Sequence, residues 1–168
     1  MSKDFKITLI VIFSIIGVVV LFMGTVNLFM YQYEISQTKN TIKIYPEIVE
    51  YLKNDYGNNL KIIHADQRGA DYFEILVSDD FENKNEEVSK KLYDISQEMI
   101  YTTKDKKNIQ DRFSVRFIFS DNYLDNKYIE FEYYNGSIND ISLNFAITQK
   151  ELDKLSENNT KVHGYSLK

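Results

Sequence analysis

Four side chains that could do chemistry alternate along one stretch in the second half of the chain: Tyr128, Glu130, Glu132 and Tyr134. The intervening residues are isoleucine, phenylalanine and tyrosine, which gives the period-two pattern of a β-strand. Successive side chains of a strand point to opposite faces, so these four would share one face. Because the other face is apolar, theirs should be the solvated one.

Two kinds of chemistry suit this face. Carboxylates two residues apart on a strand lie about 7 Å from each other, within the roughly 6.5–9.5 Å that inverting glycoside hydrolases need. Any acidic pair with this spacing meets that condition, so the spacing is weak support for hydrolysis. Acidic side chains mixed with tyrosines also make protein-contact surfaces, because tyrosine supplies contact area at low entropic cost.

An ordinary polar sheet face is the blander interpretation and the commoner one. Among the surfaces that could be functional, this face still ranks first, with Ser114 and Arg116 beside it on the neighbouring strand. The sequence therefore predicts one candidate partner-binding face, made of Arg116, Tyr128, Glu130, Glu132 and Tyr134.

The rest of the chain offers little catalytic chemistry. Its two histidines are His64, in a strand-like stretch, and His163, near the C-terminus, and a structural role is the commoner one for each. No nucleophile elbow, zinc-protease helix, phosphate-binding loop or dinucleotide fingerprint occurs. The absence of cysteine excludes disulfides, thiol catalysis and thiolate metal sites. We therefore expect no catalytic residue and no cofactor.

Two acidic clusters could gather oxygen ligands for calcium. One comprises Asp79, Asp80 and Glu82, and the other lies within residues 121–126. Neither has the Asp-x-Asx-x-Asx-Gly order of an EF-hand loop, and turn and helix-cap chemistry accounts for both. The sequence therefore predicts no metal site.

Hydrophobic periodicity predicts the elements that position the candidate face. A helix should begin at Pro46 and end before Gly57, and a second should run from Asn83 or Asn85 to about Thr102. Alternation predicts strands at residues 60–65, 72–78, 113–120, 129–134 and 141–147, with a turn at Asn135-Gly136 and a short helix at 149–155. Alternation also implies one buried and one solvated sheet face. We therefore expect an α+β fold in the order α-β-β-α-β-β-β, with about five antiparallel strands and two helices packed on one face.

Residues 7–30 form the longest apolar stretch, 24 residues without a charge. As a helix it would be roughly 36 Å long, and about 20 such residues span the hydrocarbon core of a bilayer. A buried core helix rarely stays apolar on every face for so long. A cleaved signal peptide is the stronger alternative, because Lys3 and Lys6 would supply its positive n-region, but its apolar run is usually about 7–15 residues. We therefore favour an uncleaved transmembrane anchor.

The flanking charges predict the direction of this anchor. Lys3 and Lys6 lie on its N-terminal side, and the positive flank of a membrane span faces the cytoplasm. The C-terminal part would then lie outside the cytoplasm, at the cell membrane. The predicted organisation is a cytoplasmic tail at residues 1–6, the anchor at 7–30, a juxtamembrane linker at 31–43, a soluble α+β domain at 44–156 and a loose C-terminal tail at 157–168.

The soluble part is acidic: from Ile44 to Lys168 it has 16 Lys and Arg against 23 Asp and Glu, a net charge of −7. Nucleic-acid binding needs a basic footprint and is therefore disfavoured. A negative domain suits a cationic partner, or simply solubility. Because a domain outside the cytoplasm without disulfides is ordinary in bacteria, we expect a bacterial protein.

These observations favour a membrane-anchored, non-enzymatic binding or regulatory module with a protein partner of unknown identity. An immunity protein that guards the outer face of the cell membrane against a secreted toxin would be one form of it. A pseudopilin-like structural subunit is an alternative, although no glycine precedes the apolar run and no glutamate lies inside it. A cell-wall hydrolase that uses Glu130 and Glu132 is another alternative.

Overall fold

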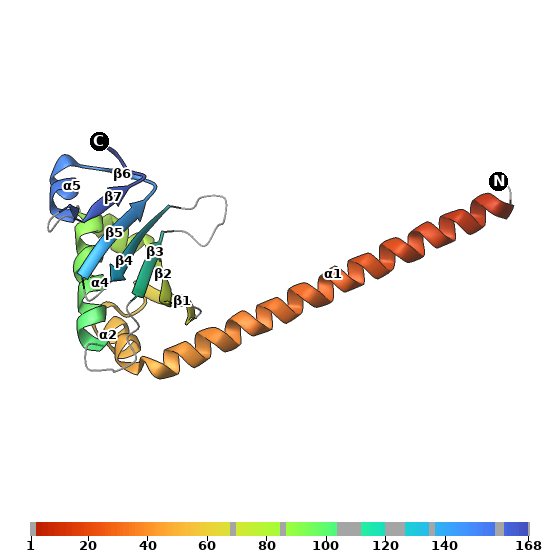
Figure 1. Cartoon of the computed structure of the whole chain (residues 1–168), viewed down its shortest axis with the longest axis horizontal. Coiled ribbons are helices and arrows are strands. Elements are labelled where there is room, and N and C mark those ends of the chain that lie inside the picture. Colours follow the sequence, from red (N-terminus) through yellow and green to blue (C-terminus); the bar gives the residue numbers. More distant parts are fainter. Residues whose placement is uncertain are drawn as a thin grey trace. The chain divides into compact units, whose positions relative to one another are not determined.

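The computed structural model describes the backbone of residues 3–67, 70–84, 87–103, 112–119, 127–134, 137–156 and 160–167, with side chains from residue 12 onward except at 83 and 84. The chain divides into two compact units, Met1–Ser36 and Gln37–Lys168. The described residues of the first unit are helical, and the second unit holds helices and a β-sheet (Figure 1). The predicted α+β fold class is therefore confirmed.

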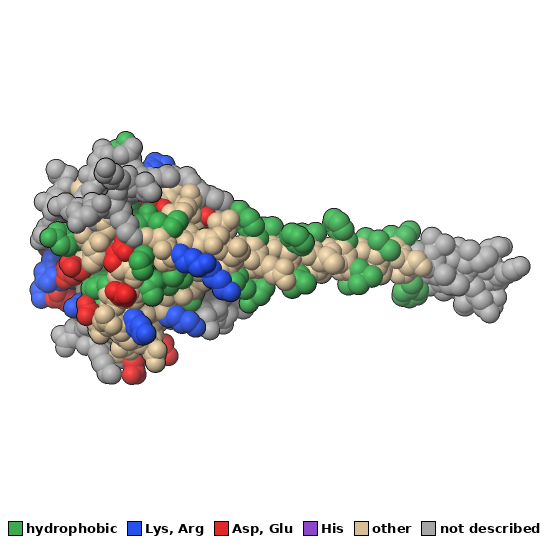
Figure 2. Space-filling model, turned by 90° about the horizontal axis from the view of Figure 1, so that it is seen from below, with side chains coloured by type: hydrophobic (Ala, Val, Ile, Leu, Met, Phe, Trp, Pro, Cys, Tyr) green, Lys and Arg blue, Asp and Glu red, His purple; other side chains and the backbone are tan. Residues whose placement is uncertain are grey.

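Helix α1 (Lys3–Ile44) begins in the first unit, and its apolar side chains are exposed there. Figure 2 shows hydrophobic side chains along the coloured length of α1. Ile12–Ile44 is long and apolar enough to cross a membrane: its apolar window has a mean hydropathy of 2.4, and none of that window is buried inside the protein. Both a membrane anchor and a signal sequence have these properties.

The last turns of α1 belong to the second unit. The predicted linker, residues 31–43, is helical, and Thr41 is buried. The Thr38 hydroxyl accepts a hydrogen bond from the Ala65 backbone N–H at 3.2 Å and lies 3.4 Å from His64 Nδ1. These contacts bond the end of α1 to strand β1 (Leu60–Asp66).

Tyr45 separates α1 from α2 (Pro46–Tyr56) and is fully buried. The residue before a proline disfavours helical conformation, and Tyr45 has φ −120° and ψ 57°, so α2 begins at Pro46 as predicted. The Tyr45 hydroxyl donates a 2.5 Å hydrogen bond to Asp71 Oδ2, and Gln67 Nε2 donates to Asp71 Oδ1 at 3.1 Å. Burial raises the pKa of Tyr45, which keeps its phenol protonated as the donor.

The second unit is built on a six-stranded sheet in the order β1, β2 (Asp71–Val77), β3 (Arg112–Ile118), β4 (Tyr128–Tyr134), β5 (Ser137–Leu143) and β7 (Lys161–His163). The pairs β1–β2, β3–β4 and β4–β5 are antiparallel. The pairs β2–β3 and β5–β7 are parallel. A separate parallel pair joins β6 (Ala146–Ile147) to β8 (Ser166–Leu167).

Helical crossovers produce the parallel pairs. Helices α3 (Asp79–Lys84) and α4 (Val88–Thr103) lie between β2 and β3 in the chain, and α5 (Gln149–Leu155) lies between β5 and β7. Such a connection returns the chain to the end at which the first strand began, so the next strand runs parallel to it. The prediction of about five strands, all antiparallel, is therefore wrong, because the sheet is mixed and has six strands.

The C-terminal segment also differs from its prediction. The described part of the predicted loose tail, residues 160–167, supplies β7 and β8. These strands have three and two residues, which is too short for a visible alternation in the sequence. The predicted turn at Asn135-Gly136 lies outside the described residues, while β4 and β5 on either side of it pair as an antiparallel hairpin would.

Helices α2 and α4 pack on one face of the sheet, and the hydrophobic core lies between them and the strands (Figure 1). Helix α4 contributes Leu92, Ile95 and Met99, three members of the stripe that predicted it, and α2 contributes Ile48 and Leu52. The sheet contributes alternate residues of each strand, all at most 2 % exposed: Phe73, Ile75, Val77, Phe113, Val115, Phe117, Ile129, Phe131, Ile141 and Leu143. Two helices on one face are what the alternation predicted.

Gly164, which follows β7, offers a test of whether the C-terminal segment is held against the sheet. Gly164 has a φ of 74°, and a Cβ there would overlap the backbone oxygen of Leu143 in β5. Gly57, at the end of α2, has a φ of 58° but open space around it. A residue with a side chain held in a sparsely populated region of positive φ costs on the order of 1–3 kcal/mol. Gly57→Ala should lower the free energy of unfolding by that amount, and Gly164→Ala should lower it by clearly more.

Urea unfolding of the full chain in detergent, followed by the near-ultraviolet circular dichroism of its tyrosines, measures both variants. Gly57→Ala serves as the control, because its φ is also positive but nothing lies within 4 Å of the added Cβ. Equal losses for the two variants would show that the segment after β7 is not held against β5.

Candidate functional site

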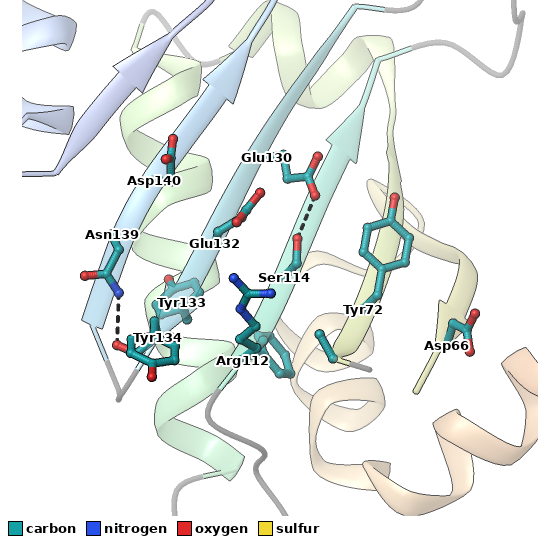
Figure 3. A pocket seen from close by; sticks show the side chains of 12 residues that line it. Asp66, Tyr72, Arg112, Ser114, Glu130, Glu132, Tyr133, Tyr134, Asn139 and Asp140 are labelled. Atoms are coloured by element: carbon teal, nitrogen blue, oxygen red, sulfur yellow. Dashed lines mark hydrogen bonds between the residues drawn. The ribbon is translucent and has the colours of Figure 1, made fainter. Parts of the chain in front are cut away.

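The face of the sheet opposite α2 and α4 carries the polar residues of each strand, and strand register aligns them in rows. One row, called here the Arg116 row, comprises His64, Glu74, Arg116, Glu130, Ser142 and His163. The next, the Ser114 row, comprises Asp66, Tyr72, Ser114, Glu132, Asp140 and Lys161. Figure 3 shows this face, with α4 behind the strands.

Arg116 is the centre of the first row. Its Nε and Nη2 donate to Glu130 Oε2 at 2.9 and 2.6 Å, and its Nη1 lies 3.9 Å from Glu74 Oε1. The guanidinium also lies 5.0 Å from the ring centre of Tyr128 and 5.8 Å from that of Tyr72, both within cation–π range. Burial alone would lower the pKa of Arg116, but the hydrogen bonds and charge of Glu130 outweigh it and raise the pKa. The row therefore contains a permanent cation between two carboxylates.

Glu130 is fully engaged within the face. Besides the bonds from Arg116, its Oε1 accepts a 2.7 Å hydrogen bond from the Ser114 hydroxyl, and its side chain is 13 % exposed. Next to it, the Tyr72 hydroxyl donates to Glu74 Oε1 at 3.2 Å. Burial, together with the charge of Glu74, raises the pKa of Tyr72, so this phenol stays neutral.

A pocket of about 800 Å³ lies over the Ser114 row, where the short serine side chain leaves space on β3 (Figure 3). Five of the six members of the row line it, and only Lys161 does not. The other residues that line the pocket are Glu130, Ala70, Arg112, Phe113, Tyr133, Tyr134 and Asn139. The lining contains four carboxylates and one guanidinium, so the pocket is acidic.

The charges in the pocket are unevenly compensated. Glu132 and Arg112 are both exposed, and neither forms an ion pair within the described part of the chain. Figure 3 shows the Arg112 guanidinium reaching over β3 toward the middle of the pocket. Asp140 Oδ1 accepts no hydrogen bond of good geometry among the described residues, although it lies 3.1 Å from His163 Nε2. That contact pairs opposite charges only when the imidazole is protonated.

The structure places all five residues of the predicted face on this one side of the sheet. Glu130, Glu132 and Tyr134 line the pocket, whereas Arg116 and Tyr128 lie beside it and outside its lining. Tyr134 is 49 % exposed, and its backbone oxygen accepts a hydrogen bond from Asn139 Nδ2 at 3.0 Å. Arg116 and Tyr128 therefore belong to the ion-paired side of the face, and Glu132 and Tyr134 border the pocket. Glu130 belongs to both.

Sequence reasoning did not assign three residues that belong to this face. Tyr72 alternates with apolar neighbours, so its exposure to this side was visible, but its place beside Ser114 depends on the parallel β2–β3 pairing. A register shift between Glu132 and Tyr133 brings Asp140 into the Ser114 row. His163 lies in β7, within the segment predicted as a loose tail.

An uncompensated carboxylate among phenol rings suits reversible binding of a polar or cationic group. Among the described residues, no group of three or more histidine, aspartate or glutamate side chains is arranged to hold a metal ion. Of the two acidic clusters in the sequence, Asp79 and Asp80 begin α3, and residues 121–126 lie outside the described residues. No protein-family model, curated protein or solved structure matches this chain.

The Arg116–Glu130 pair predicts strongly coupled stability effects. Arg116→Gln leaves Glu130 and Glu74 without their cation, so the free energy of unfolding should fall by about 1.5–3 kcal/mol, as for a hydrogen bond to a charged group. Glu130→Gln should also destabilise, and the double variant should lose less than the sum of the singles, with a coupling of about 0.5–3 kcal/mol.

The same urea unfolding experiment measures this cycle, with Arg112→Gln as the control on the same strand. Because Arg112 is exposed and forms no ion pair among the described residues, its replacement should change stability by no more than about 0.5 kcal/mol. Additive losses for Arg116→Gln and Glu130→Gln would contradict a direct interaction between the two side chains.

Proposed function

We propose that this protein is a membrane-anchored, non-enzymatic binding module that recognises a protein partner outside the cytoplasm. The observation that carries the proposal is the exposed pair Glu132 and Tyr134 beside a pocket on the sheet face opposite α2 and α4. Tyrosine and a solvated carboxylate at the edge of a hollow are typical of surfaces that bind proteins.

The apolar stretch of α1 supports the anchor. Its described side chains, from Ile12 to Met30, are exposed, and a continuous apolar surface of that size is unstable in water unless something covers it. Lys3 and Lys6 on its N-terminal side favour a cytoplasmic N-terminus, which would put Gln37–Lys168 outside the cytoplasm at the bacterial cell membrane.

The environment of Glu130 supports binding over hydrolysis. A hydrolase that used Glu130 and Glu132 would need each carboxylate free to meet the substrate or a water. Both oxygens of Glu130 already accept hydrogen bonds from Arg116 or Ser114. A carboxylate held in this way is suited to organising the face, and Glu132 is left as the carboxylate that a partner can reach.

The predicted orientation can be tested by cysteine labelling, because the natural chain has no cysteine. In intact bacterial cells, a membrane-impermeant maleimide should label Lys91→Cys, at an exposed position on α4, and should label Ser2→Cys only after the membrane is permeabilised. Mass spectrometry of the membrane-extracted chain should show that the apolar stretch is retained. The opposite labelling pattern, or a chain that lacks this stretch, would overturn the anchor or its direction.

The partner-binding face can be tested by crosslinking and pull-down of the full chain from native membranes. The variant Glu132→Lys with Tyr134→Ala should lose a stoichiometric protein that the wild type captures, because both changes are on the uncovered face and leave the Arg116–Glu130 pair intact.

The matched control is Glu98→Lys with Tyr101→Ala, which makes the same two changes at exposed positions of α4. It should capture the same protein as the wild type. Capture of no stoichiometric protein, or equal capture by both variants, would count against a protein-binding role for this face.

A further inference from the structure

We propose that the pocket over Ser114 receives an arginine side chain from a basic segment of the partner. This inference rests on the proposed protein-binding function and names the chemistry of that partner. Three features of this face favour an arginine: its charge, the guanidinium that it already holds, and the space that Ser114 leaves.

The Arg116 row shows how the face binds a guanidinium. Arg116 is held by a carboxylate on the facing strand, Glu130, by a second carboxylate on the other side, Glu74, and by the rings of Tyr128 and Tyr72. Planar guanidinium suits this setting, because it pairs with carboxylates through several N–H groups and stacks on aromatic rings. The recognition elements are therefore acidic side chains from neighbouring strands combined with tyrosine.

The Ser114 row also combines carboxylates with tyrosine, but its β3 position holds a serine instead of a cation. Its lysine, Lys161, is at the β7 end of the row and does not line the pocket. Glu132 faces Ser114 from β4, Asp140 follows on β5, and Tyr72 lies on the other side on β2. Strands lie about 4.8 Å apart, so these side chains border a strip whose centre is the position that an arginine on β3 would occupy. Serine at that position leaves the strip open as the pocket.

The electrostatics of the pocket favour a cation. Its lining has four carboxylates against the single guanidinium of Arg112. Among the four, Glu130 is paired with Arg116, and Asp140 lies 3.1 Å from His163 Nε2. Glu132 has no ion-pair partner in the described part of the chain and remains exposed. At about 800 Å³, the volume is within the range of roughly 300–1,000 Å³ typical of ligand sites, so it has room for an arginine side chain beside Arg112.

Arg112 allows a site for a cationic partner to be distinguished from a site for an anionic one. Its guanidinium reaches into the pocket (Figure 3), so a site for an anionic partner would depend on it, whereas a site for a cationic partner would be weakened by it. Replacing Glu132 and replacing Arg112 should consequently change affinity in opposite directions. The two residues provide a sign test that a general effect on folding could not imitate.

The experiment uses the full chain, labelled with ¹⁵N in an uncharged detergent, and an acetylated, amidated tetrapeptide of sequence alanine-arginine-arginine-alanine. The backbone amide signals of Ser114, Glu132 and Asp140 should shift in a saturable way. Glu132→Gln should weaken binding roughly tenfold, because one charge-assisted contact is lost. Arg112→Gln should strengthen it about two- to threefold, because a like charge is removed. The counterpart peptide with two glutamates, at the same ionic strength, should leave these signals unchanged.

Three outcomes would overturn the inference: equal or stronger binding of the glutamate peptide, loss of binding in Arg112→Gln, or binding that appears only in Arg112→Gln. The last would show that Arg112 already occupies the strip. Failure here is distinct from failure of the proposed function. A partner captured by the wild type and lost by Glu132→Lys with Tyr134→Ala, without arginine-peptide binding, keeps the binding module and removes the arginine. Arginine-peptide binding without a captured protein would keep the arginine site and count against the proposed protein-binding function.

Discussion

The polar face depends on the ion pairs that the guanidinium of Arg116 forms with Glu130 and Glu74. The guanidinium lies between carboxylates from the two neighbouring strands, Glu74 on β2 and Glu130 on β4. Without a cation there, both carboxylates would lose their opposite charge, and a largely buried carboxylate such as Glu130 without a partner is costly. Glu74 reaches this row only because β2 pairs parallel to β3. The charge balance of the face is therefore a consequence of the crossover through α3 and α4.

In the neighbouring row, Ser114 has the β3 position that Arg116 has in its own row, and a pocket lies over it. Its hydroxyl supports Glu130, and its short side chain leaves the space that an arginine would fill. Glu132 is then a carboxylate without an ion-pair partner among the described residues, and its exposure leaves it solvated by water. The same exposure leaves Glu132 available to a partner.

The sequence predicted the buried faces well and the strand directions poorly, for a physical reason. Period-two alternation reports which side chains are buried, and it correctly located β3 and β4 and put Arg116, Glu130 and Glu132 on one face. A parallel strand with one open face alternates in the same way, so the direction had to be argued from the helix between β2 and β3. The pocket was not predicted, because it depends on the shift between Glu132 and Tyr133 that aligns Asp140. The only sign of that shift in the sequence pattern is the three-residue spacing of Ile138 and Ile141, and the alternation was followed only from Ile141 onward.

The pocket and the end of α1 are connected through one hairpin. The β1–β2 hairpin forms one wall of the pocket, and it is bonded to the segment where α1 ends, through Thr38 to Ala65 and through Tyr45 to Asp71. Asp71 is buried, so losing the phenol donor would leave a buried carboxylate short of a hydrogen bond, which is costly. This wall is therefore not a free loop. A ligand that moved this wall would act on the buried hydrogen bond between Tyr45 and Asp71.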